Sequence, residues 1–190
     1  MRRLVITALA VLLGGCGKDS PPVVLQPAFG NAPTPTSALA AIDLAPVLIA
    51  NGDLPPDYTL EPLTSQGQAP YSLPGLSVPD ARLIQSFNNR QAMSGYGSII
   101  LYRDQTVVSD MYSRMVKNMG TAATILSGLG EQATQVADPA DPSRATKVVF
   151  IRCHALVELQ GYSARTAAPG LLVTWAQKID QRSQYSAICQ

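Results

Sequence analysis

The segment from Thr146 to Leu159 constrains the fold more than any other part of the chain. Alternate side chains along it are apolar, which is the pattern of a strand with one buried face. The predicted buried face carries Val149, Ile151, Cys153, Ala155, Val157 and Leu159, and the other face carries Arg152, His154 and Glu158. A shorter strand from Glu131 to Ala137 precedes it, and the Asp- and Pro-rich loop 138–142 predicts a β-hairpin.

Two amphipathic helices are expected to pack on this sheet. Asp104 can cap the first helix, whose apolar residues recur at helical spacing until Gly120 ends it. Its apolar stripe consists of Val108, Met111, Tyr112, Met115 and Met119. The second helix follows Pro169, and its apolar side consists of Leu171, Leu172, Trp175, Ala176 and Ile179.

Shorter elements complete the predicted fold. Asp43 is the expected N-cap of a short helix that Asn51-Gly52 ends. Strands are predicted over 58–60, 81–87 and 96–102, with a long irregular loop over 64–80. Strands joined by short turns favour antiparallel pairing. We therefore expect an α+β fold, a mainly antiparallel sheet with amphipathic helices packed on it as a two- or three-layer sandwich. We expect this fold to form a single domain, 43–190.

The N-terminal residues have the pattern of an export signal. Arg2 and Arg3 are followed by an apolar run from Leu4 to Leu13. A helix that spans a bilayer needs about 20 apolar residues, so this shorter run predicts a cleaved signal peptide, 1–15.

The tetrapeptide Leu13-Gly14-Gly15-Cys16 resembles the lipobox of bacterial lipoproteins. The resemblance implies cleavage after Gly15 and fatty acyl chains on Cys16, which hold the chain on a membrane because two or three chains bind stably. The alternative is an ordinary signal peptide that leaves Cys16 as a free thiol. Gly17, where an aspartate would favour inner-membrane retention, favours the outer membrane in a cell that has two.

The segment that follows Cys16 is predicted to be a tether. Residues 17–41 are rich in Pro, Ala, Ser and Thr and carry only Lys18 and Asp19 as charges. Such a composition buries too little apolar surface to offset the entropy of ordering, so 16–42 is assigned as a lipidated, disordered linker. Without residues 1–15, the 14 Lys and Arg fall to 12 against 13 Asp and Glu, a net charge of −1. This balance gives no basic surface for nucleic acid.

Two cysteines remain after Cys16, namely Cys153 and Cys189. A pair of cysteines in an exported chain favours a disulfide between them, and the tail of the last helix is expected to bring them together. The alternative is two separate thiols.

No catalytic or metal-binding pattern stands out. His154 is the chain's one histidine, and the strand pattern aims it away from Cys153, which argues against a Cys–His nucleophile. Zinc needs three or four closely spaced ligands that the sequence lacks, so no metal is expected. Asp53 and Asp57 are expected in a turn, and Asp138 and Asp141 in a hairpin loop, where Asx turns explain the hairpin pair.

Two glycine patterns resemble known sites only in part. Gly128-Leu129-Gly130-Glu131-Gln132-Ala133 matches the G-x-G-x-x-A spacing of dinucleotide sites, but it precedes a predicted strand instead of a helix, so no cofactor is expected. Gly95-Tyr96-Gly97-Ser98 lacks the register of a nucleophile elbow and is interpreted as a flexible start of a strand.

The layout of residues 43–185, with Asp53-Leu54-Pro55, Gly128-Leu129-Gly130-Glu131 and a long terminal helix, resembles envelope lipoproteins with PsbP-like or LpqN-like sandwiches. The resemblance implies a binding, sensing or assembly role on a membrane surface. We therefore expect a non-enzymatic module that binds an apolar small molecule or an envelope protein. The alternatives are a hydrolase with an unusual Ser/Asp site and a purely structural role. A groove beside Met111, Met115 and Met119 is the predicted apolar site, although such a stripe also suits core packing.

Overall fold

The computed structural model describes residues 38–50, 52–63, 77–89, 93–162 and 170–190. They form an α+β fold, as predicted, in which helices pack against a seven-stranded antiparallel sheet. The strands are β1 (Thr59–Leu60), β2 (Ala81–Asn88), β3 (Ser94–Leu101), β4 (Ala123–Ile125), β5 (Gln132–Asp138), β6 (Asp141–Arg152) and β7 (Ala155–Tyr162). The helices are η1 (Ala38–Ala41), α1 (Ala45–Leu48), α3 (Gln105–Met119), η2 (Gly120–Ala122), α4 (Leu171–Gln184) and η4 (Ala187–Cys189).

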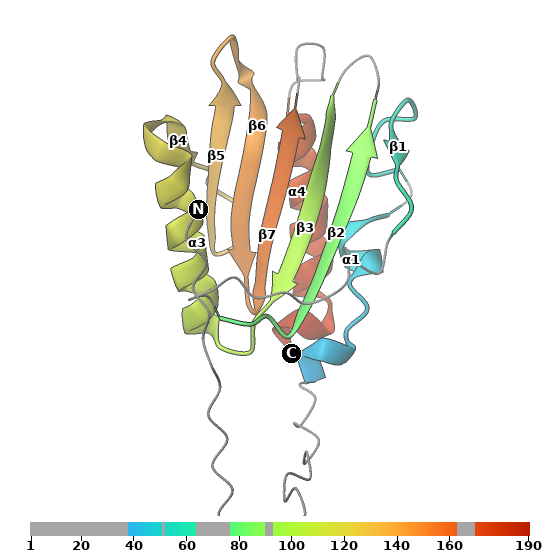
Figure 1. The fold of residues 1–190 in the computed structure, drawn as a ribbon, viewed down its shortest axis with the longest axis vertical. Helices are drawn as coiled ribbons and strands as arrows, with labels where there is room; N and C mark the ends of the chain where they lie inside the picture. Colours follow the sequence, from blue (N-terminus) through green and yellow to red (C-terminus); the bar gives the residue numbers. More distant parts are fainter. Residues whose placement is uncertain (1–37, 51, 64–76, 90–92, 163–169) are drawn as a thin grey trace, which may run out of the picture. The chain divides into compact units, whose positions relative to one another are not determined.

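The order of the strands across the sheet is β1-β2-β3-β7-β6-β5-β4 (Figure 1). Hairpins join neighbours along the chain, such as β2 with β3 and β6 with β7. The long-range pairing is between β3 and β7, where Ser98 lies opposite Glu158. This pairing joins the two hairpin groups into one sheet.

The two faces of the sheet carry different helices. Val148 and Phe150 of β6 belong to the larger core cluster, which includes Trp175 of α4 and Leu48 of α1. Val149 and Ile151, which alternate with them, pack with Val108 of α3. The α4 face is therefore the one covered by α4 and α1, and the α3 face is the opposite one. Figure 1 shows α4 behind the sheet.

The prediction of one continuous strand from Thr146 to Leu159 was wrong. The chain turns back at Cys153-His154, so Arg152 pairs with Ala155. Cys153 has a φ of 52°, and its N–H donates to Oε1 of Glu131 at 2.8 Å. The turn puts Val149 and Ile151 on the α3 face but Val157 and Leu159 on the α4 face. The apolar run concealed it because neither loop residue is a glycine, asparagine or aspartate, the usual turn signals.

Several local predictions are confirmed. The carboxylate of Asp104 accepts from Thr106 N at 2.8 Å and caps α3, and Gly120 ends that helix. The β5–β6 hairpin forms with a shorter loop than expected. The disulfide between Cys153 and Cys189 is present, with the Cα atoms 5.2 Å apart.

The N-terminal boundary differs from the prediction. Leu39 and Ile42 pack against the core, so the packed part of the chain includes η1, ahead of the expected start near Asp43. Leu44 is the N-cap of α1, and Asp43 instead accepts from Ala45 N at 3.0 Å. The signal peptide, Cys16, most of the tether and loop residues 64–76 lie outside the described residues.

Candidate functional site

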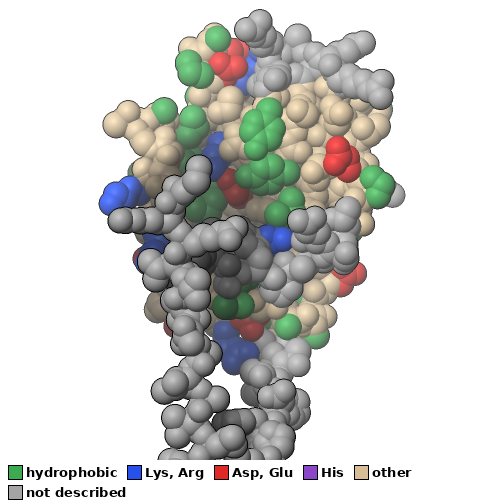
Figure 2. Space-filling model, viewed as in Figure 1, with side chains coloured by type: hydrophobic (Ala, Val, Ile, Leu, Met, Phe, Trp, Pro, Cys, Tyr) green, Lys and Arg blue, Asp and Glu red, His purple; other side chains and the backbone are tan. Residues whose placement is uncertain are grey.

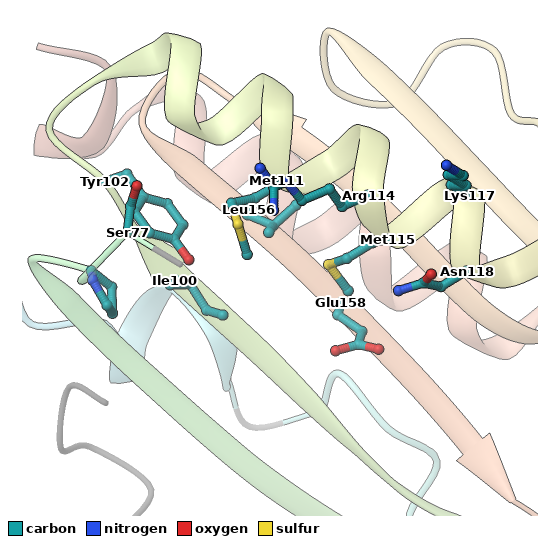
Figure 3. A pocket seen from close by; sticks show the side chains of 11 residues that line it. Ser77, Ile100, Tyr102, Met111, Arg114, Met115, Lys117, Asn118, Leu156 and Glu158 are labelled. Carbon is teal, nitrogen blue, oxygen red and sulfur yellow. The ribbon is translucent and has the colours of Figure 1, made fainter. Parts of the chain in front are cut away.

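A cavity of about 510 Å³ lies between α3 and strands β3 and β7. Met111 and Met115 reach from the helix toward Ile100 and Leu156 of the sheet (Figure 3). Its walls consist of Ser77, Pro79, Ile100, Tyr102, Met111, Arg114, Met115, Lys117, Asn118, Leu156 and Glu158. Tyr102 lies at one end of this cavity, and Lys117 and Asn118 lie at the other (Figure 3).

The apolar stripe of α3 divides into two parts. Val108 and Tyr112 are buried, and Tyr112 Oη lies 2.6 Å from Thr134 Oγ1, so these two residues attach the helix to the sheet. The three predicted methionines are only partly buried. Met111 and Met115 line the main cavity, and Met119 lines an adjoining hollow of about 390 Å³ that shares Met115 and Asn118 with it. The helix is thus attached along one row of side chains and leaves space beside the next.

Among the described residues that line the cavity, Glu158 of β7 is the one carboxylate. Its Oε1 lies 2.5 Å from Nζ of Lys147, and the side chains are 15% and 23% exposed respectively. A partly buried carboxylate this close to an ammonium is neutralised by it. Lys147 lines the adjoining hollow, so the pair lies where the two spaces meet.

The rim of the cavity along α3 is cationic. Arg114 Nε binds Asp110 Oδ2 at 2.8 Å, and both side chains are more than half exposed. Lys117, one turn further along the helix, pairs with no acidic side chain of the residues that the structure describes. An exposed ion pair contributes little to stability, so Arg114 can exchange its partner at small cost.

The α3 face of the sheet continues past the cavity onto β3 and β2. No helix of the described residues lies over this part of the α3 face. A shallow hollow of about 250 Å³ there shares Ile100 and Glu158 with the main cavity. Tyr96 and Tyr162 stand beside it with ring centroids 6.4 Å apart, and Tyr162 is 51% exposed. Figure 2 views this face and shows hydrophobic side chains among charged ones over the middle strands.

The candidate catalytic residues have structural partners. Nδ1 of His154 lies 3.0 Å from the carbonyl oxygen of Tyr102, at the β6–β7 turn. Both sulfurs of Cys153 and Cys189 are in the disulfide, so neither is a nucleophile in this state. In the described ranges no three His, Cys, Asp or Glu side chains are grouped so that they could hold a metal ion.

The aspartates proposed for turns do serve the backbone. Asp138 accepts from Ala140 N at 2.8 Å, and Asp141 accepts from the side chain and the N–H of Ser143, which lowers the pKa of Asp141. Asp53 is buried and accepts from Ala50 N and from Arg182 of α4, both at 2.8 Å. None of these three lines the cavity beside α3. Asp53, Asp138 and Asp141 are therefore not brought together beside α3.

The two glycine motifs also have structural explanations. Gly128 and Gly130 have φ values of 78° and 56° in the turn between β4 and β5, and a strand follows them instead of a helix. Gly97 lies within β3, so its interpretation as a flexible start was wrong. A Cβ there would come within 2.9 Å of Leu159 Cδ2 and 3.0 Å of Trp175 Cη2. The glycine makes room for the indole of α4.

The sheet side of the cavity was not predicted from the sequence. Glu158 was expected on the strand face opposite the core, with no link to α3, and Ile100, Tyr102 and Leu156 were not singled out. Ile100 and Leu156 lie opposite each other in the β3–β7 pairing, a long-range contact that local sequence patterns do not indicate.

Comparison of the chain with protein-family models, with curated proteins and with solved structures gave no match. Within the described part of the chain, no helix is both long and apolar enough to cross a membrane.

Proposed function

We propose that this chain is a lipid-anchored lipoprotein of the bacterial cell envelope, whose domain binds a small apolar molecule without transforming it. The cavity between α3 and the sheet is the observation that carries the binding role. Its volume of about 510 Å³ lies within the range of small-molecule sites. Methionine side chains suit such a site because they are flexible and polarisable, so they adapt to apolar ligands of different shape.

The anchor is argued from the sequence. Leu13-Gly14-Gly15-Cys16 supplies the processing pattern, and lipid on Cys16 would hold the binding domain at a membrane surface. A Cys16→Ser variant tests this part. It is expected to leave the membrane fraction of the native host, and wild-type chain is expected to incorporate a clickable fatty acid. A variant that stays with membranes as firmly as the wild type would contradict the anchor.

The binding role is tested on residues 16–190, produced without the signal peptide and with Cys16→Ser. This protein is purified without detergent. The probe is N-phenyl-1-naphthylamine, a neutral molecule that fluoresces in apolar surroundings. We expect saturable binding, and we expect Met115→Trp to abolish it by filling the cavity that Met115 lines. The matched control is Ser113→Trp, an exposed position on the same helix, which should bind the probe as the wild type does.

Thermal unfolding of both tryptophan variants separates loss of the site from loss of the fold. Equal probe binding by a folded Met115→Trp variant would show that the probe lies elsewhere. Absence of saturable binding to the wild type would remove this cavity as a site for neutral apolar molecules.

A further inference from the structure

We propose that the ligand of this cavity is an anionic amphiphile, whose acidic head group binds Lys117 at the C-terminal end of α3 and whose apolar chain lies between the methionines and the sheet. This inference rests on the proposed binding function and adds the chemical class and orientation of the ligand.

The apolar chain fits the part of the cavity away from Lys117. Met111 and Met115 form its helix side, and Ile100 and Leu156 form its sheet side. Met111, Met115 and Ile100 are only partly buried, so their apolar side chains still expose surface to water. Covering that surface with an apolar chain removes both the wall and the chain from water, which favours binding.

The head group fits the other end. Lys117 and Asn118 lie together there, and Arg114 is one turn back on the helix. The described charged side chains at this end, together with their ion-pair partners, are three cations and two carboxylates. The cations are Arg114, Lys117 and Lys147, and the carboxylates are Asp110 and Glu158. This end therefore has a net positive charge and a lysine without an acidic partner among the described residues.

The same geometry disfavours a cationic head group. Glu158 is the carboxylate that the described part of the cavity wall offers to a cation, and Nζ of Lys147 already lies 2.5 Å from its Oε1. A cationic ligand would have to displace Lys147 and leave a largely buried ammonium without its partner, which costs free energy. A carboxylate or a phosphate needs no such rearrangement, because Lys117 is available as a donor.

The test compares ligands that share one chain and differ in head-group charge. Dodecanoate, dodecyl phosphate, dodecanol and dodecyltrimethylammonium are titrated by isothermal calorimetry into the processed chain carrying Cys16→Ser, below their micelle concentrations. The anionic ligands are expected to bind at least about tenfold more tightly than the cationic one, because only an anion can accept a charge-assisted hydrogen bond from Lys117. Comparing the affinities of dodecanoate and dodecyl phosphate distinguishes a carboxylate head group from a phosphate head group.

Variants of Lys117 locate the head group. Lys117→Gln is expected to bring dodecanoate affinity to within about twofold of that for dodecanol, and Lys117→Arg is expected to retain the preference. The control is Arg103→Gln, which removes the same charge from a 65% exposed side chain that does not line the cavity. This control should leave the preference intact.

Two outcomes overturn the inference. Equal affinity for the four ligands would show that charge plays no part, and a preference that survives Lys117→Gln would place the head group elsewhere. Calorimetry with dodecanoate reads this result directly, so it stands even if the neutral probe fails to bind. Dodecanol binding without anion preference would leave the proposed apolar binding in place and reject only the head-group assignment.

Discussion

The two faces of the sheet are covered in different ways. On the α4 face, Trp175 and Phe87 are each 1% exposed and meet edge to face with ring centroids 5.2 Å apart. Trp175 Nε1 also donates to the carbonyl of Leu48 at 3.2 Å. On the α3 face, the methionines of α3 are only partly buried and leave a cavity beside them. One face therefore holds the fold together by close packing, and the other keeps an open space beside its helix.

The α4 face gives the largest expected effect. Trp175→Ala removes a large buried side chain and leaves the carbonyl of Leu48 without its indole donor, so we expect a loss of about 3–5 kcal/mol of unfolding free energy. Urea denaturation measures it. A loss below about 1 kcal/mol would mean that the α4 face is no more tightly packed than the α3 face.

The disulfide adds stability on the α4 side of the molecule, because it ties the chain beyond α4 to the β6–β7 turn. Cys153 and Cys189 are separated by 36 positions, and the chain-entropy model gives about 3–4 kcal/mol for a loop of that length. The double variant Cys153→Ser/Cys189→Ser should lose this amount in denaturant titration, and reductant should lower the wild type to the same value. A reductant effect on the double variant would instead point to another cause.

The α3 face should respond more weakly to truncation. Met115→Ala removes a side chain that is only partly buried, so we expect about 1 kcal/mol of destabilisation. The probe-binding affinity should fall at the same time, because Met115 lines the cavity. The matched control, Trp175→Ala, should bind the probe normally while folded. Stability loss at Met115 as large as that at Trp175 would break the contrast between the faces.

The smallest effect concerns the cap of α3 in acid. Asp104 accepts hydrogen bonds from the side chain and the N–H of Thr106, which lower its pKa below the ordinary value of 3.8. The ionised Asp104 cap therefore stabilises the fold fully above the ordinary pKa of 3.8. This stabilisation is lost as the pH falls through the lower pKa of the folded state. Asp104→Asn can still cap the helix but cannot titrate, so its unfolding midpoint should fall less than the wild type's between about pH 5 and pH 2. Parallel pH profiles for the two proteins would contradict this cap.

Features that depend on neighbouring residues were predicted from the sequence more fully than features that depend on long-range contacts. The cap at Asp104, the end of α3 at Gly120 and the antiparallel class follow from residues close together in the chain, and each is confirmed. The turn at Cys153-His154 was missed because its residues carry no turn signal, and the backbone there is held by Glu131 and by the disulfide from distant parts of the chain.

Local sequence patterns were sufficient to predict α3, α4, the β5–β6 hairpin and the apolar side of each of these helices, because periodicity and capping act over a few residues. They did not predict the β6–β7 turn, the position of β3 beside β7, the room that Gly97 makes for Trp175, or the cavity beside the methionines of α3, all of which depend on contacts in the folded chain. The physical reason is that a cavity depends on the separation of two packed surfaces. That separation is set where side chains of α3 meet the sheet, as Tyr112 of α3 meets Thr134 of β5, and these two residues lie far apart in the chain.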